Sequence, residues 1–154
     1  MDAVFKKLNY RGQERVHIFN HPGSFETNLG SLEGEAEIKT SARKNDTIEF
    51  AMLFATKQAE IDKAVPKFAP KLEGDAVLWI CYPKGTSKNY SCDFNRDTGF
   101  EILGEYDLEP VRMVAIDDDW SALRFRKVDY IRSLKRKSSM ALSRKGKARS
   151  RQNP

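Results

Sequence analysis

The sequence predicts a single α/β domain, a three-layer sandwich with a mostly parallel sheet of about six strands. Val77–Tyr82 is an unbroken apolar run between Gly74-Asp75 and Pro83, which is typical of a central strand covered on both faces. Most of the other predicted strands are separated by segments with helical spacing, as crossovers between parallel strands require. Only the last connection is short enough for a hairpin, so we expect an antiparallel strand at the C-terminal end of the sheet.

The first part of the chain predicts two short helices and two strands. Ala3–Leu8 has the spacing of a short helix, and Arg15–Phe19 that of a first strand. Ser24 is a typical helix cap, and we expect it to begin a short helix that carries Phe25 and Leu29. Glu35–Thr40 is more polar, which indicates an edge strand.

The middle of the chain predicts a buried strand followed by the main helix. After a polar connection over Ser41–Thr47, the third strand, Ile48–Ala55, is apolar enough to be buried on both faces. Lys57–Leu72 has apolar residues at helical spacing, so one face should pack on the sheet. Pro66 and Pro70 should kink or end this helix.

The last part of the domain predicts one more helix and a hairpin. Asn95–Tyr106 offers an Asn cap and a partly apolar face, although Gly99 weakens the helix. Pro110 then introduces a fifth strand, Val111–Ile116. The turn at Asp117–Trp120 leads into a sixth strand, Ser121–Lys127.

Length and composition fit one soluble domain. The chain has 154 residues, of which 40% are hydrophobic and 32% charged, enough for a proper core. Its longest apolar run is far shorter than the roughly 18 residues that a membrane span needs, and the N-terminus lacks an apolar signal core. We therefore expect a cytoplasmic protein with no membrane contact. Its oligomeric state is left open.

The charge is unevenly distributed along the chain. Residues 1–131 hold 18 of the 27 lysines and arginines and all 22 acids, so this part carries about −4, whereas residues 132–154 carry +9. We expect residues 1–131 to form the domain and residues 132–154 to be a weakly ordered basic tail, because so many cations without acids repel one another.

The loop after the central strand is the candidate binding site. Pro83–Lys88 follows this strand at its carboxyl end, where open α/β sheets usually bind ligands. Lys84 and Lys88, with the hydroxyls of Thr86 and Ser87, suit a phosphate or carboxylate. The glycine spacing and the following helix of a P-loop are missing. A solvated loop with incidental lysines is the alternative.

Other residues give weaker signals, and we expect neither a cofactor nor a metal. Asn20–Gly23 holds a single glycine, and Lys39-Thr40 stands where a dinucleotide or S-adenosylmethionine (SAM) site would have an acid. Asp117–Asp119 suits a turn better than a hard-metal site. Cys81 and Cys92 lack the close spacing of a zinc or redox motif. His21 follows a strand, where a catalytic base could work, but loop histidines are more often ordinary polar residues.

Several segments together resemble an uncharacterised bacterial family of small domains of unknown function, whose members look like shortened class I methyltransferase folds. The similarity covers roughly residues 3 to 130 in matching order. It rests on Lys7–Gln13, Tyr82–Lys88, Asn95–Asp97 and Ala115–Arg126. The resemblance implies that five side chains converge near the carboxyl ends of the two central strands: Lys84, Ser87, Arg96, Asp117 and Trp120. The long basic tail departs from the compact end of that family.

These observations predict a non-catalytic binding or regulatory domain with an anion-favouring pocket. No nucleophile and base, and no metal cluster, can be assembled from neighbours in the sequence. An enzyme that acts on an anionic small molecule at the same pocket is the first alternative. Nonspecific nucleic-acid binding by the tail is the second.

The nucleic-acid alternative is testable with a chain that ends at Ile131. If the tail neutralises phosphates, the full chain should bind RNA and DNA with a steep salt dependence, about 0.9 in log-log slope for each phosphate of duplex DNA, and removal of the tail should abolish it. Equal affinities of the two chains would contradict this role. The cations that would share the contacts are Lys135, Arg136, Lys137, Arg144, Lys145, Lys147, Arg149 and Arg151.

Overall fold

A six-stranded sheet forms the centre of the computed structural model, which describes residues 1–131. The strands lie in the order β2-β1-β3-β4-β6-β5. They are β1 (Arg15–Phe19), β2 (Glu37–Lys39), β3 (Ile48–Phe54), β4 (Leu72–Pro83), β5 (Leu108–Ala115) and β6 (Trp120–Lys127). The first four are parallel, and β6 runs antiparallel between β4 and β5. The predicted fold class, including the antiparallel strand at the C-terminal end, is confirmed.

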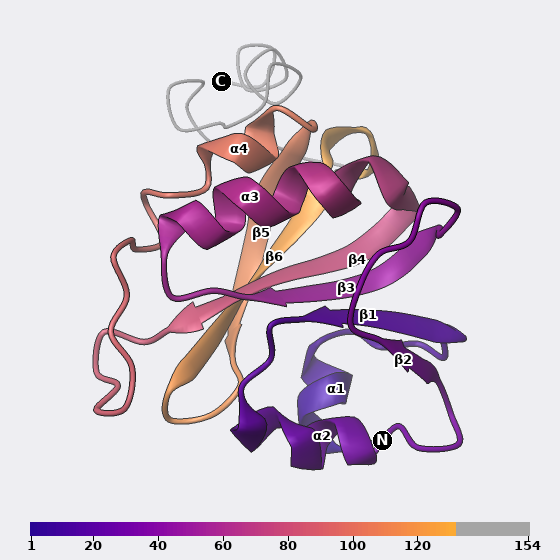
Figure 1. Cartoon of the computed structure of the whole chain (residues 1–154), viewed down its shortest axis with the longest axis horizontal. Helices are drawn as coiled ribbons and strands as arrows, with labels where there is room; N and C mark the ends of the chain where they lie inside the picture. Colours follow the sequence, from indigo (N-terminus) through magenta and orange to yellow (C-terminus); the bar gives the residue numbers. More distant parts are fainter. Residues whose placement is uncertain (132–154) are drawn as a thin grey trace.

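Helices cover both faces of this sheet (Figure 1). The upper face, as drawn there, carries α3 (Gln58–Phe68) and α4 (Glu101–Gly104). The lower face carries α1 (Ala3–Lys7) and α2 (Glu26–Gly30). Three short 3₁₀ turns, η1 (Gly23–Phe25), η2 (Ala69–Lys71) and η3 (Val128–Tyr130), complete the described elements. No helix among residues 1–131 is long and apolar enough to cross a membrane.

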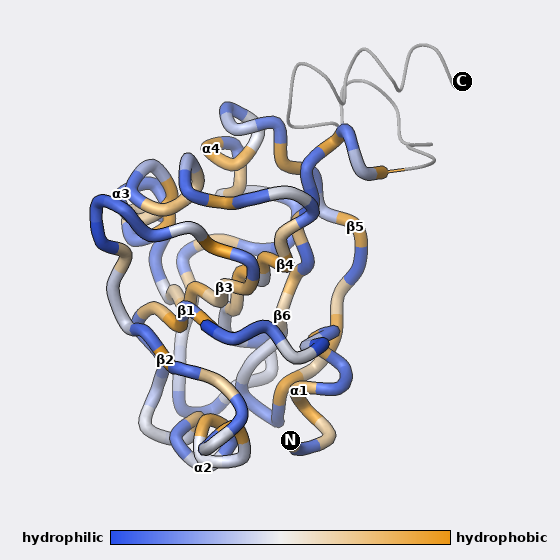
Figure 2. The backbone as a smooth tube through the Cα atoms, turned by 90° about the vertical axis from the view of Figure 1, so that its right-hand side faces the viewer, coloured by the Kyte–Doolittle hydropathy of each residue, from blue (hydrophilic) through white to orange (hydrophobic). Residues whose placement is uncertain are grey.

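The core consists of two apolar layers separated by the sheet. Side chains of β3 and β4 alternate between them: Leu53 and Ile80 belong to the upper layer, and Met52 and Trp79 to the lower. Val77–Tyr82 is buried throughout, as its composition predicts. Figure 2 shows that β3 and β4, at the centre, consist largely of hydrophobic residues, drawn in orange.

The predicted helix at Asn95–Tyr106 is wrong for most of its length, since only α4 is helical. The Asn95 carboxamide accepts a hydrogen bond from the Asp97 amide within a turn, at 2.8 Å, and does not cap a helix. Gly99 then takes a left-handed φ of 92°. A Cβ at this position would lie 2.8 Å from Cβ of Phe94, so the glycine allows Phe94 to enter the core and delays the helix.

Two smaller expectations also need correction. Ser24 lies inside η1, whose N-cap position is Pro22, and it caps no helix. Strand β5 begins at Leu108, so Pro110 lies within the strand, where a register irregularity between Pro110 and Arg112 accommodates it. Helix α3 continues through Pro66 and ends at Phe68, before Pro70. An end near these prolines is one of the two predicted effects.

Trp79 joins the sheet to the N-terminal helix and provides a stability test. Its indole N–H donates to the carbonyl oxygen of Leu8 at 2.8 Å, and the side chain is fully buried. Trp79→Phe leaves that carbonyl without its donor, so we expect unfolding to become easier by about 1 to 3 kcal/mol, measured by denaturant titration. Tyr130→Phe, at an exposed position, is the control. An unchanged midpoint for Trp79→Phe would contradict the role of this hydrogen bond.

Candidate functional site

The topology changes direction beside β1. The chain passes from β1 to β2 on one side and then returns past β1 to β3 on the other. In open α/β sheets, ligands bind outside the carboxyl ends of the strands at such a point. Here those ends are Phe19-Asn20 after β1 and Thr40-Ser41 after β2. The left-handed Asn20, with φ of 58°, turns the chain away from the sheet edge.

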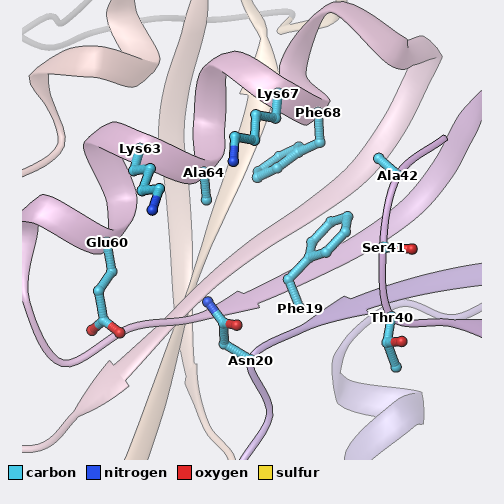
Figure 3. A pocket seen from close by; sticks show the side chains of 10 residues that line it. All are labelled: Phe19, Asn20, Thr40, Ser41, Ala42, Glu60, Lys63, Ala64, Lys67 and Phe68. Atoms are coloured by element: carbon cyan, nitrogen blue, oxygen red, sulfur yellow. The ribbon is translucent and has the colours of Figure 1, made fainter. Parts of the chain in front are cut away.

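A cleft of about 550 Å³ lies at this point, between α3 and the segments that follow β1 and β2 (Figure 3). Lys63 and Lys67 extend from α3 toward the cleft, and Phe19 and Asn20 lie across from them at the end of β1. The lining residues are Phe19, Asn20, Thr40, Ser41, Ala42, Glu60, Lys63, Ala64, Lys67 and Phe68.

The cleft exists because the crossover from β2 to β3 contains no helix. Residues 40–47 run as turns and coil back across the upper face, and Ala42 packs only at the margin of the upper apolar layer. A crossover between parallel strands usually contains a helix. Without one, the space beside α3 is filled only in part, by the rings of Phe19 and Phe68, which stack with centroids 5.1 Å apart.

The walls of the cleft differ in charge. Lys63 and Lys67 are four residues apart in α3, so they lie on one face of the helix, and neither makes an ion pair within the described part of the chain. Glu60 is the only acid of the lining. Its Oε1 accepts from the amides of Thr56 and Lys57, at 2.9 and 3.0 Å, and from the Thr56 hydroxyl at 3.2 Å. This carboxylate is therefore held at the start of α3.

A buried histidine lies next to the cleft, beneath the crossover. His17 is almost completely buried, its ring lies 6.1 Å from that of Phe19, and its Nε2 lies 3.4 Å from Oδ2 of Asp46. Asp46 also accepts from the amide of Arg43 at 2.8 Å and from Lys39 Nζ at 3.0 Å, and these bonds lower its pKa. Burial lowers the pKa of His17, and Asp46 offsets part of that effect.

A second cleft, of about 440 Å³, lies on the α2 side of β2 and shares Thr40 with the first. His21 and Glu26 line it, with Nε2 of the histidine 2.6 Å from Oε1 of the glutamate. The pair joins the turn after β1 to the first turn of α2. Sequence reasoning considered His21 alone and had no signal for its partner.

The predicted anion site at Pro83–Lys88 lies farther along the same sheet edge, and neither cleft is lined by its residues. The amide of Lys84 donates to the Asp119 carbonyl at 2.8 Å. The Ser87 hydroxyl donates to Oδ1 of Asp119 at 2.9 Å and accepts from the amides of Asn89 and Tyr90. Thr86 and Lys88 are exposed. A carboxylate of the chain itself thus holds this loop.

Of the remaining predicted residues, the structure brings two to this loop. Asp117 accepts from the amides of Asp119 and Trp120 at 2.8 Å, so it shapes the hairpin turn as expected. Trp120 is buried against Phe54, with Tyr90 on its other side. Arg96 is exposed in the loop before α4, 4.0 Å from Asp97, and makes no ion pair with the Ser87–Asp119 group.

Metal ligands do not gather in the described structure. Among residues 1–131, no group of three His, Cys, Asp or Glu side chains could hold an ion. Cys81 is buried, which raises the pKa of its thiol, and Cys92 is half-buried. The candidate nucleic-acid residues of the tail, from Lys135 to Arg151, lie outside the described residues.

Comparison with solved structures supports the architecture. The chain superposes on the pyocyanin biosynthetic protein PhzM with a TM-score of 0.55 at 11% identity, over 81% of this chain and 53% of that one. It superposes on a SAM-dependent methyltransferase from Aquifex aeolicus with a TM-score of 0.53 at 10% identity, over 81% and 88% of the two chains. The chain has a methyltransferase-like fold.

A further match is magnesium protoporphyrin IX methyltransferase from Synechocystis PCC 6803 with bound SAM, with a TM-score of 0.51 at 9% identity, over 80% of this chain and 74% of that one. The chain spans about half the length of PhzM. No protein-family model matches the sequence, and no curated protein matches it significantly. Identities this low support the fold alone.

The cleft residues were missed by sequence reasoning, although part of the signal was present. Lys63 and Lys67 are four residues apart in the predicted helix, on the side next to its apolar stripe. What the sequence does not reveal is that residues 40–47 leave this side of α3 open. The composition of this crossover predicts only a polar connection.

The buried His17 predicts an acid-sensitive fold. Its native pKa is below the ordinary value of 6.5, so the unfolded chain takes up the proton first as the pH falls. Its contribution to stability is complete above about pH 6.5 and is lost as the pH falls toward the native pKa. In His17→Gln the denaturant midpoint should depend less on pH between about pH 7 and pH 5. In His21→Gln, which retains His17, the midpoint should fall with pH as steeply as in the wild type. Asp46, whose native pKa is lowered, stabilises the fold above about pH 4 and loses this contribution only at lower pH, outside the range of the test. Equal slopes in the two variants would contradict the assignment.

Proposed function

We propose that the chain is a non-catalytic binding domain that takes an anionic small molecule in the cleft between α3 and the ends of β1 and β2. The observation that supports this most directly is the pair Lys63 and Lys67, which extend toward the cleft and make no ion pair among the described residues. Two ammonium groups on one wall favour a phosphate or carboxylate.

The rest of the lining suits a ligand with both an anionic and a flat apolar part. Thr40, Ser41 and Ala42 form the wall opposite α3. Phe19 is only half-buried and stacks on Phe68, so a ring of the ligand can extend this stack. A volume of about 550 Å³ is within the usual range for small-molecule sites.

An enzyme acting on the same anion is the competing function, and the chemistry of the cleft favours binding. Its single acid, Glu60, accepts three hydrogen bonds at the start of α3, two of them from backbone amides. These bonds fix the Glu60 carboxylate at the start of α3, against the segment that precedes the helix. The cleft lining includes neither a histidine nor a cysteine.

SAM is a candidate ligand to consider, because the structurally similar Synechocystis methyltransferase contains it. Two features of this chain argue against it. The turn after β1 has one glycine, and Lys39-Thr40 stands at the end of β2 in place of an acid that would bind ribose hydroxyls. We therefore propose a ligand other than SAM. We also propose that the chain is related to the uncharacterised bacterial family that its sequence resembles.

Two double variants test the location of the anion site. Lys63→Gln/Lys67→Gln removes both charges from the cleft, and Lys84→Gln/Lys88→Gln removes two from the loop that the sequence favours. Calorimetry with adenosine monophosphate, inorganic phosphate and SAM at low salt should give a loss of at least about tenfold in nucleotide affinity for the first variant only.

The other results would each reject part of the proposal. A loss confined to the Lys84/Lys88 variant would move the site to the loop. Equal affinities of the wild type and both double variants would contradict anion binding by either pair of lysines. Tight binding of SAM, or methyl transfer from labelled SAM to any acceptor, would replace a binding domain with an enzyme.

A further inference from the structure

Three cations gather on the lower face of the sheet, opposite the cleft. Arg112 of β5 is the register partner of Arg124 of β6, which is in turn the partner of Trp79 of β4. Both guanidinium groups lie over the Trp79 indole, with Cζ 5.3 Å and 5.9 Å from its centroid. Lys7, at the end of α1, lies beside Arg112: its carbonyl accepts from Arg112 Nη2 at 3.1 Å, and its Nζ donates to the carbonyl of Ala115 at 2.7 Å.

Arg124 is unusual because it is buried although no carboxylate within residues 1–131 forms an ion pair with it. Its exposed fraction is 6%, and its Nε has no hydrogen-bond partner. Burial lowers its pKa to about 10. Asp75 is the one carboxylate that acts on it electrostatically, but both oxygens of Asp75 are bound by Arg126, at 2.9 and 2.7 Å. Within residues 1–131, Arg124 makes no ion pair.

The other two cations are positioned by the backbone but not neutralised. Lys7 Nζ donates to the carbonyl of Ala115 at 2.7 Å, and Arg112 donates to the carbonyl of Lys7. Neither makes an ion pair with a described residue. Like charges directly opposite on neighbouring strands destabilise a sheet, and a buried charge is costly unless it is paired. The Trp79 ring offsets this only in part.

We propose that Arg112 and Arg124 form a phosphate-binding site on the lower face of the sheet, independent of the cleft beside α3. Guanidinium groups match the geometry of phosphate oxygens and bind them with two parallel hydrogen bonds. The unpaired Nε of Arg124 supplies the buried donor. Arg112 is exposed, so the phosphate enters from that side and any remaining part of its molecule stays in solvent.

The chemistry favours phosphate over a carboxylate. Two guanidinium groups and one ammonium group carry three positive charges, and none of the three side chains makes an ion pair within residues 1–131. A phosphate monoester is close to a dianion at neutral pH, so it offsets more of this charge than a carboxylate does. The same reasoning explains why inorganic phosphate is a suitable probe.

The first experiment follows the full chain by NMR during titration with inorganic phosphate at constant ionic strength. The Trp79 indole N–H signal, assigned by its loss in Trp79→Phe, should shift and saturate, and acetate should produce at most a tenth of the response at equal concentration. A Trp79 signal that does not respond to phosphate would overturn the site. An equal response to acetate would overturn its assignment to phosphate.

The second experiment separates binding from a purely structural role of Arg124. In phosphate-free buffer, Arg124→Met should be at least as stable as the wild type, because an apolar side chain removes an unpaired buried charge, and phosphate should not raise its melting temperature. Phosphate should raise that of the wild type and of Arg96→Gln, which loses one exposed charge elsewhere. An Arg124→Met chain that is less stable and responds to phosphate like the wild type would reject the proposal.

Arg112→Gln covers the case in which Arg124→Met does not fold. Its side chain is exposed, so the fold should persist while the phosphate response falls by at least about tenfold in apparent affinity. An unchanged response would reject the site. The Lys63→Gln/Lys67→Gln protein should keep the full response at Trp79, which makes this result independent of the proposed function.

Discussion

The structure depends on the burial of β4 on both faces. The carboxyl half of β4, Val77–Tyr82, needs cover on both faces, since either face left open would expose an apolar row. It therefore needs β3 on one side, β6 on the other and a helix above and below. The Trp79 hydrogen bond to Leu8 fixes the N-terminal helix against the lower face. The parallel pairing of β1, β3 and β4 then brings their carboxyl ends to one edge.

The candidate site follows from what this arrangement leaves uncovered. The β4 strand is enclosed, but β2 lies at the sheet edge and the crossover that follows it has no helix. Asp46 is the main contact of that crossover with the sheet, through Lys39 and His17. It holds the crossover over the amino half of β1. The carboxyl half, at Phe19, is left facing α3, and the cleft with Lys63 and Lys67 occupies that gap.

The sequence was sufficient for the elements that strong local patterns determine. Arg15–Phe19 and the apolar run of β4 were predicted because alternation and continuous apolarity are local signals. The prediction of a helix at Asn95–Tyr106 was wrong because Gly99 allows a tertiary contact with Phe94 that composition does not show. The cleft beside α3 was not predicted for a related reason, since it depends on the path of residues 40–47 in three dimensions. The loop at Pro83–Lys88 shows cations and hydroxyls in sequence, but only the structure reveals that Asp119 accepts from Ser87.

Charge balance makes the unpaired cations informative. Residues 1–131 hold more acids than bases, so a shortage of carboxylates does not explain why Lys63, Lys67 and Arg124 make no ion pair within this part of the chain. The chain does pair cations elsewhere, as Lys39 with Asp46 and Arg126 with Asp75 show. Exposed lysines lose little by being solvated, so Lys63 and Lys67 are suggestive mainly because they border a cleft. Arg124 is buried and makes no ion pair within residues 1–131, so of these three cations it is the one whose charge an added anion would stabilise most.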